Sequence, residues 1–204
     1  HPNFASNRFV YLSYNKPGAD GGASMLGIAR GVWNGSALTR VADIFVSEPG
    51  TSGTARMAFG PTDGMLYVTT SGGDAQDPNT LAGKVLRLTD TGGVPQDNPF
   101  VGKAGYRPEI YTLGHRNSLD IVLHPGTGDI WNSENGPNGG DELNIIRAGK
   151  DYHIRAKDIR KDGTVFDVEV MGTGFELDGR KYLLAVVRDI DLERSDARSL
   201  VIPD

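Results

Sequence analysis

Two matching stretches of sequence decide the fold, FGPTDGMLY at residues 59–67 and LHPGTGDIW at residues 123–131. They repeat at a constant spacing of 64 residues, and each places a Pro/Gly/Asp turn between two apolar segments. Such turn chemistry between short apolar runs is typical of a β-hairpin. A looser third copy begins with Pro2 and Phe4 and continues through residues 9–14, so we expect the same hairpin there.

A hairpin repeat with a period near 60 residues fits one four-stranded blade of a β-propeller with generous loops. Between the copies, residues 38–46 and 84–88 supply further strand segments. Two blades and part of a third are visible in the sequence, whereas a closed ring needs about four or more. We therefore expect a mainly β fold that begins with an incomplete β-propeller of two to three four-stranded antiparallel blades.

The composition of the chain changes near residue 150. Residues 1–150 hold 26 charged residues and 24 glycines, while the rest of the chain holds 21 charged residues and only 4 glycines. This change predicts a partial propeller over residues 1–152 and a second segment over residues 153–204. Within the second segment, residues 164–170 alternate apolar and polar side chains, and residues 181–188 form a strand-like run with an apolar core. Together they predict an antiparallel β-meander.

Composition excludes several classes of function. The net charge of −5 offers no basic surface, so nucleic acid is not an expected partner. No apolar run approaches the ~18 residues that span a bilayer, so no membrane span is expected. The absence of cysteine removes disulfides and thiolate metal sites. Because the chain begins with His1 and shows no leader, we expect a mature or excised piece whose targeting segment lies outside it.

The densest group of candidate functional residues lies between Tyr111 and Tyr152. It begins with Gly-His-Arg-Asn at residues 114–117, just before a short apolar strand segment. The forked donors of Arg116 suit a carboxylate or a quinone oxygen. An ion pair between Arg116 and a nearby carboxylate, such as Asp141 or Glu142, is the structural alternative. The residues alone leave both interpretations open.

An acidic, glycine-rich loop, SENGPNGGDE, follows at residues 133–142. Its carboxylates and its glycines, which let backbone carbonyls converge, offer the oxygen ligands that Ca²⁺ prefers. The acidic spacing is not that of an EF-hand. The alternative is a solvated Asn/Gly turn in which Asp141 and Glu142 cap the following segment.

A further loop and one histidine each have a functional and a structural interpretation. The loop at residues 71–77 follows a strand segment at 66–70, and its small residues keep the strand end open to a ligand that Asp74 or Gln76 could face. A plain surface loop is the alternative. His115 is interpreted as a packed, hydrogen-bonded histidine and not as a base. The sequence contains no Ser-His-Asp order, phosphate loop or dinucleotide fingerprint.

The order of several motifs resembles the soluble quinoprotein sugar dehydrogenases, the glucose/sorbosone dehydrogenase family of six-bladed propellers that use pyrroloquinoline quinone (PQQ). The matching runs span nearly all of residues 1–152 and are HPNF at 1–4, GKVLRL at 83–88, VPQDNPF at 94–100, GHRN at 114–117 and SENGPNGGDELN at 133–144. The resemblance implies an oxidoreductase that oxidises the anomeric carbon of aldose sugars by hydride transfer to PQQ, and that needs a sugar and an electron acceptor as partners.

The resemblance also implies roles for individual residues. The residues it assigns to the PQQ pocket are Arg116, Asn117, Asn135 and Asp141. It assigns Gly136 and Pro137 to the Ca²⁺ ion through their backbone carbonyls. It places Asp74 near the catalytic centre.

The sequence departs from the family at the catalytic base. In the family, a histidine four residues before the arginine matched by Arg56 removes the proton from the sugar hydroxyl. That position here is Ser52, which lacks comparable basicity. The family's usual Gly-Trp-Pro is replaced by residues 153–155, His-Ile-Arg, and the later blades are not in the sequence. We therefore expect a truncated dehydrogenase with weak or no activity by itself.

The tail has a resemblance of its own. Residues 153–194, through RKDGTVFDVEV at 160–170 and Arg-Asp-Ile at 188–190, resemble the C-terminal half of a PAS sensory domain. The third residue of the exit motif is Asp191 instead of threonine. One alternative function is therefore a sensory or interaction module that uses the PAS-like tail for signalling or dimerisation, and another is an inactive propeller relic or gene fusion.

Location and assembly follow from these resemblances. The dehydrogenase resemblance implies a periplasmic or secreted protein, and a dominant PAS-like tail would imply a cytoplasmic one. Exposed blade edges, or the PAS-like tail, are expected to promote self-association because unpaired strand edges offer free backbone groups.

Overall fold

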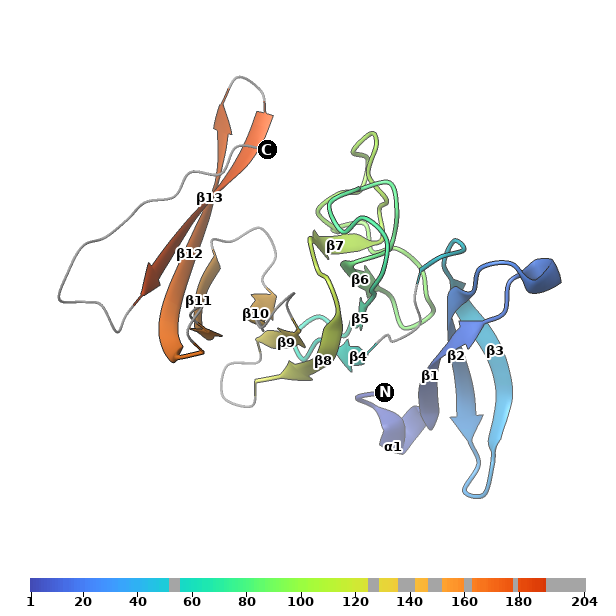
Figure 1. Ribbon diagram of the computed structural model, residues 1–204. Helices are drawn as coiled ribbons and strands as arrows, with labels where there is room; N and C mark the ends of the chain where they lie inside the picture. Colours follow the sequence, from blue (N-terminus) through green and yellow to red (C-terminus); the bar gives the residue numbers. More distant parts are fainter. Residues whose placement is uncertain are drawn as a thin grey trace.

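The computed structural model describes residues 1–51, 56–124, 129–135, 142–146, 152–159, 163–177 and 180–189. These residues form short strands joined by turns (Figure 1). The elements are α1 (Phe4–Asn7), β1 (Phe9–Lys16), η1 (Ala19–Gly21), β2 (Met25–Trp33), β3 (Leu38–Val46), β4 (Met57–Phe59), β5 (Leu66–Thr69), β6 (Lys84–Leu88), β7 (Ile110–Leu113), β8 (Ser118–Leu123), β9 (Ile130–Glu134), β10 (Glu142–Ile146), β11 (Tyr152–Ile159), β12 (Val165–Leu177) and β13 (Arg180–Asp189). None of the helices in this described part has the length and apolarity needed to cross a bilayer.

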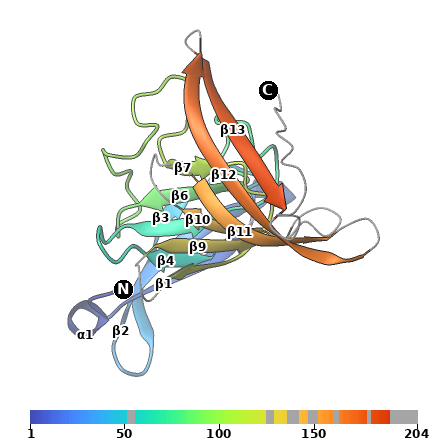
Figure 2. The same cartoon turned by 90° about the vertical axis from the view of Figure 1, so that its left-hand side faces the viewer.

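The strands pair into four small antiparallel sheets, which Figures 1 and 2 show from two sides. Their strand orders are β1-β2-β3, β4-β5-β6-β7, β10-β9-β8 and β11-β12-β13. Among the described residues, only the β4–β7 sheet has four strands, so the expectation of two to three four-stranded blades is too high. The next strand, β11, belongs to a different sheet, in which it pairs along its length with β12. The mainly β, antiparallel character is confirmed.

The sequence repeat corresponds to two hairpins with the same register. Phe59 pairs with Leu66 between β4 and β5, and Leu123 pairs with Ile130 between β8 and β9. In the first hairpin, the Oδ1 atom of Asp63 accepts a hydrogen bond of 3.0 Å from the backbone N–H of Met65, two residues on in the same turn, which is the turn role expected of aspartate. Both predicted hairpins are therefore confirmed.

The predicted hairpin at the start of the chain is wrong in its first half. The segment before β1 forms the single helical turn α1, closed by a hydrogen bond from Arg8 N to Phe4 O of 2.9 Å. Arg8 has a φ of 56°, which ends the helix, and the side chain of Asn7 then accepts a hydrogen bond from Phe9 N (2.9 Å). Local side-chain bonding by asparagine thus replaces the expected strand.

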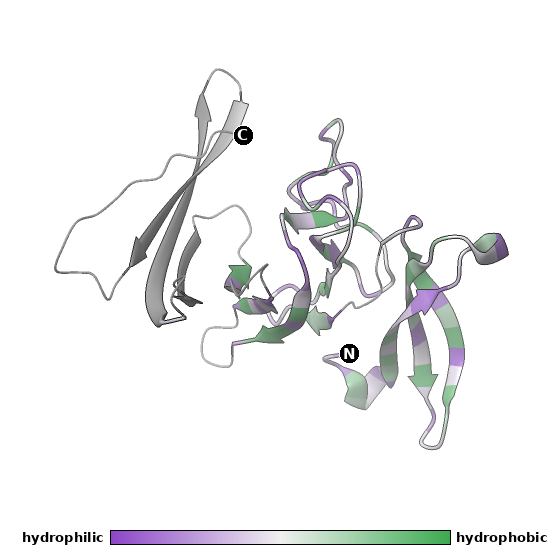
Figure 3. Ribbon diagram, in the orientation of Figure 1, coloured by the Kyte–Doolittle hydropathy of each residue, from purple (hydrophilic) through white to green (hydrophobic). Residues whose placement is uncertain are grey.

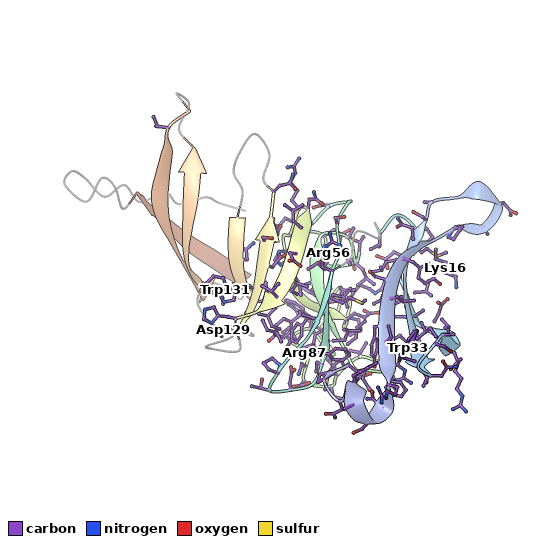
Figure 4. The ribbon with its side chains drawn as sticks, turned by 90° about the horizontal axis from the view of Figure 1, so that it is seen from below. Lys16, Trp33, Arg56, Arg87, Asp129 and Trp131 are labelled. Carbon is purple, nitrogen blue, oxygen red and sulfur yellow. The ribbon has the colours of Figure 1, made fainter. Side chains whose placement is uncertain are left out.

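The β4–β7 sheet is buried on both faces. Figure 4 shows side chains crowding the space between this sheet and the β1–β3 sheet. One face packs in a core with β2, made of Leu26, Ile28, Leu66, Val68, Leu81, Leu86, Leu88 and Ile110. The opposite face packs against β8, β9 and β10 in a second core, made of Tyr67, Val85, Ile121, Ile130 and Ile146. Side chains of β5 and β6 therefore alternate between two neighbouring sheets, as the stacked blades of a propeller require.

The two flanking sheets are less buried than the central one. In Figure 3, the ribbon of β1, β2 and β3 carries mixed apolar and polar bands. Several large apolar side chains of the outer sheets are exposed. The exposed large apolar residues of the described part are Leu12, Val41, Val46, Leu119, Val122 and Leu123. These residues lie on β1, β3 and β8, so the outer sheets keep apolar surface that the described residues leave uncovered.

The segment after residue 152 forms the sheet β11-β12-β13, which extends away from the other sheets in Figure 1. Its strands run antiparallel, with Val170 opposite both Ile154 and Val187. Gly163, in the turn before β12, has a φ of 86°, which suits glycine. The predicted antiparallel meander is confirmed.

Candidate functional site

An open cavity of about 510 Å³ lies where the loop after β5 meets the residues that follow β7 and β9. Its lining residues are Ser71, Gly72, Gly73, Ala75, His115, Arg116, Asn117 and Asn135. The volume is within the usual range for a small-molecule site. Two stretches that the sequence singled out, residues 71–77 and residues 114–117, therefore each supply one wall of the same cavity.

The first wall, residues 71–75, is anchored by a buried lysine. Lys84 begins β6 and is 0% exposed, and its Nζ donates to the carbonyls of Ala82 (2.5 Å), Ala75 (2.9 Å) and Asp74 (3.3 Å). Burial lowers the pKa of the Lys84 ammonium, and nearby carboxylates such as Asp77 partly oppose that shift. Three carbonyls directed at one ammonium fix the loop that forms this wall.

Main-chain hydrogen bonds join the first wall to the second. Gly114 N donates to Ala75 O (2.9 Å), and His115 N donates to Gly83 O (3.0 Å). Gly83 has a φ of 64°, and a Cβ atom there would lie 2.5 Å from His115 O. Only glycine permits both this backbone conformation and this close approach, so Gly83 fixes the spacing of the two walls.

The second wall rests on a buried carboxylate at the end of β9. Glu134 is 4% exposed, and its Oε1 accepts hydrogen bonds from Asn132 Nδ2 (2.6 Å), Asn144 Nδ2 (3.1 Å) and His115 Nδ1. Its Oε2 accepts a hydrogen bond from the backbone N–H of Arg116 (2.9 Å). Burial by itself raises the pKa of Glu134, but the hydrogen bonds and charge of its donors, His115 above all, outweigh burial and lower it.

His115 uses both ring nitrogens inside the protein. Its Nδ1 bonds Glu134, and its Nε2 bonds the hydroxyl of Thr112 at 2.7 Å. The side chain is buried, although it contributes to the cavity lining. The interpretation of His115 as a packed, hydrogen-bonded histidine is confirmed.

Arg116, Asn117 and Asn135 come together at the mouth of the cavity. Asn117 Nδ2 donates to Asn135 Oδ1 (2.6 Å), and Asn135 N donates to Asn117 O (3.3 Å). Arg116 is exposed, and one of its Nη atoms approaches Asn135 O at 3.5 Å. Arg116 also contributes to the cavity lining, and its side chain forms no salt bridge with any described residue.

The other predicted site residues are placed differently. Asp74 is exposed and is not among the lining residues; its Oδ1 accepts a hydrogen bond from Gln76 N (2.9 Å), which closes its own turn. Ser52 lies outside the described residues. The same holds for Gly136, Pro137 and Asp141, so the predicted Ca²⁺ loop has no described geometry, and the described side chains form no metal-binding cluster of their own.

The sequence did not reveal the two residues that support the walls. Lys84 lies in a run of strand residues, KVLRL, where lysine reads as a strand-end surface residue. Glu134 reads as one more acid of the loop. Their roles depend on tertiary contacts over 10 to 19 positions of chain, which no local pattern encodes.

A family model described as glucose/sorbosone dehydrogenase matches residues 1–155. Aldose sugar dehydrogenase YliI of Escherichia coli is 38% identical over an aligned length of 162 residues, and the match covers 74% of this chain and 43% of that protein. Quinoprotein glucose dehydrogenase B of Acinetobacter calcoaceticus is 30% identical over an aligned length of 182 residues, and the match covers 74% of this chain and 37% of that protein. The chain thus spans less than half the length of these two relatives.

A solved structure extends the likeness of fold. The PQQ-bound form of aldose sugar dehydrogenase from Streptomyces coelicolor superposes with a TM-score of 0.59 and 24% sequence identity, over 98% of this chain and 64% of that chain. At this identity, the likeness concerns the fold alone.

Proposed function

Because the chain belongs to the glucose/sorbosone dehydrogenase family, we propose that it is a PQQ-dependent aldose dehydrogenase-type protein whose cavity forms one wall of the quinone site. The observation that carries this proposal is the meeting of Arg116, Asn117 and Asn135 with the glycine-rich loop at residues 71–75. The family resemblance assigns three of these residues, Arg116, Asn117 and Asn135, to the cofactor pocket.

The lining residues fit a flat, anionic quinone. The Arg116 guanidinium offers a planar fork of donors to a carboxylate, and the amides of Asn117 and Asn135 supply neutral donors and acceptors. Gly72 and Gly73 present no side chain, so a planar ring can approach their backbone. When bound, PQQ supplies the two-electron acceptor for sugar oxidation. The residues of this chain bind and orient it.

The acidic loop extends this proposal to a metal. Asp141 is proposed to line the quinone pocket, and Gly136 and Pro137 are proposed to offer carbonyls to Ca²⁺, as hard cations prefer oxygen ligands. Asp74 is proposed to act near the catalytic centre, which requires its turn to open toward the cavity. Removal of Ca²⁺ with a chelator is expected to weaken PQQ binding, measured by dialysis against the chelator followed by titration; unchanged affinity would reject the metal.

Catalysis depends on the position held by Ser52. A serine hydroxyl does not accept a proton near neutral pH, so PQQ binding with weak or absent dye reduction is expected for aldoses. Ser52→His is expected to raise the rate of aldose-dependent dye reduction by about a hundredfold or more, in line with the usual size of general-base contributions. Robust turnover by the unaltered chain would contradict this assignment of the base.

The tail supports a second candidate function. The β11-β12-β13 sheet pairs only within itself among the described residues, which suits a PAS-like half-domain used for signalling or dimerisation. Dimerisation that survives deletion of residues 1–150, measured by analytical ultracentrifugation, would favour this function. Loss of dimerisation on that deletion would favour a tail without a dimerisation function of its own, as in an inactive propeller relic or a gene fusion.

The same proposal covers partners and location. We expect a sugar substrate and a separate electron acceptor, and a periplasmic or secreted location for the intact protein; a cytoplasmic location would instead accompany the PAS-like function. Fractionation of cells that produce the intact protein separates these two outcomes.

A further inference from the structure

We propose that Glu134 is the positioning residue of the cavity: its buried carboxylate fixes the main chain at Arg116 and thereby aims Arg116 and Asn117 at the bound quinone. This inference rests on the proposed function for the identity of the ligand. Its geometric part concerns only the residues of this chain.

The two carboxylate oxygens of Glu134 accept hydrogen bonds from two successive residues, His115 and Arg116. Oε2 accepts the backbone N–H of Arg116 at 2.9 Å, and Oε1 accepts the Nδ1 hydrogen bond of His115, the residue directly before it. One carboxylate therefore holds a side chain and the next peptide group together. Asn132 and Asn144 also donate to Oε1, so four donors hold the carboxylate in place.

Glu134 is also linked to the other lining residue of the second wall, Asn135. It directly precedes Asn135, which exchanges hydrogen bonds with Asn117 through both its side chain and its backbone N–H. Movement of Glu134 would therefore displace Asn135 and Arg116 at once. The lining residues of the second wall are thus coupled through one buried group.

Glu134 acts through these neighbours and not on the ligand itself. It is 4% exposed and is not a lining residue. A buried carboxylate costs free energy to desolvate, and an apolar residue would stabilise a strand end at least as well. The buried Oδ1 of Asn132, one of its donors, has no hydrogen-bond partner among the described residues. The cost of burying the Glu134 carboxylate is therefore better explained by the precise position it gives Arg116 than by a gain in stability.

The test compares Glu134→Gln with a matched control in the full chain. Glutamine keeps the size of the side chain but replaces one carboxylate oxygen of Glu134 by an NH₂ group, which donates and would face N–H donors. We expect the Arg116 amide to exchange with solvent about tenfold faster or more, and the Kd for PQQ with Ca²⁺ to rise about tenfold, which corresponds to ~1.4 kcal/mol. The control is Asp63→Asn, because Asp63 bonds Tyr67 and Arg87 and touches no lining residue.

Two comparisons separate positioning from general damage. Asp63→Asn should lower stability and leave the PQQ affinity unchanged. In an Arg116→Lys background, the effect of Glu134→Gln on affinity should shrink, because the two residues act as one unit. Glu134→Asp keeps the charge and should retain part of the PQQ affinity. If Glu134→Gln does not fold, the exchange rate of the Arg116 amide is measured in Glu134→Asp instead.

The outcomes are distinct. An unchanged Arg116 amide in the Glu134 variants, or an equal loss of affinity in both Arg116 backgrounds, overturns the positioning role. If the unaltered chain binds no PQQ, the proposed function fails, while the amide exchange of Arg116 still decides whether Glu134 fixes the wall.

Discussion

Two buried charges of opposite sign support the cavity walls, Lys84 behind the loop at residues 71–75 and Glu134 behind residues 115–117. Each holds backbone groups of the wall by charge-assisted hydrogen bonds, which are stronger than neutral ones. The shape of the cavity therefore depends on residues that do not line it.

Replacement of Lys84 by methionine keeps the length of the side chain and removes the charge. We expect Lys84→Met to lower the free energy of unfolding by about 2 kcal/mol, because three carbonyls lose their donor in a buried site. Urea unfolding measures this loss. Lys103→Met is the control, since Lys103 is an exposed cation above Tyr106, and it should change stability by about 0.5 kcal/mol or less. Equal losses of stability in the two variants would show that the hydrogen bonds from Lys84 to the three carbonyls do not stabilise the fold.

Glu134 also makes stability depend on pH. The folded state lowers its pKa below the ordinary value of 4.5, so the unfolded chain binds this proton first as the pH falls. The stabilisation is therefore fully present above that ordinary value and is lost as the pH falls through the lowered pKa. Urea unfolding at a series of acidic pH values should show a steeper decline for the unaltered chain than for Glu134→Gln. Parallel declines would contradict this linkage.

At the scale of single residues, the motifs predicted three of the lining residues, Arg116, Asn117 and Asn135, only because they resemble a family. Residue chemistry alone left Arg116 between a ligand and a carboxylate partner. The acid that matters to it is Glu134, which bonds its backbone N–H and not its guanidinium. A pattern of charges along the sequence cannot distinguish these two kinds of contact.

At the scale of elements, the turn before β6 sets the distance between the walls. Gly83→Ala should lower the free energy of unfolding by about 3 kcal/mol, because a Cβ would meet His115 O and Ala75 Cβ at 2.5 and 2.6 Å and the φ is 64°. It should also weaken PQQ binding. Gly105→Ala shares the positive φ but meets nothing within 4 Å, so it should lose about 1 kcal/mol and keep the affinity. Thermal unfolding with PQQ titration distinguishes the two.

The hairpin repeat predicted β4–β5 and β8–β9 well, because their turns carry their own proline, glycine and aspartate signals. The strand β2 was not predicted. Gly27 and Gly31 interrupt its apolar pattern, but Tyr14 and Leu38 from the neighbouring strands cover these glycines. Cross-strand covering of a glycine is invisible until the pairing is known. The helical turn α1 was missed for a related reason, since side-chain bonds of Asn7 decide it.

At the scale of the whole molecule, the β1–β3 and β8–β10 sheets keep apolar side chains in solvent, including Leu12 and Val41 on the first. We expect concentration-dependent self-association of the chain, because such surface is favourably buried in a partner. Val41→Lys should reduce it without loss of stability, as Val41 is 52% exposed. Sedimentation velocity at several concentrations tests this. A chain that stays monomeric at all concentrations would contradict self-association through these apolar surfaces.

The central claim is that Arg116 and its neighbours bind PQQ, and one equilibrium titration tests it most directly. PQQ is added, with Ca²⁺, to the unaltered chain and to Arg116→Ala, and the absorbance of bound quinone is followed. Saturable binding by the unaltered chain is predicted, with a Kd that rises about tenfold or more in Arg116→Ala because a charge-assisted pair is lost. Absence of saturable binding, or the same Kd for both proteins, would contradict the account.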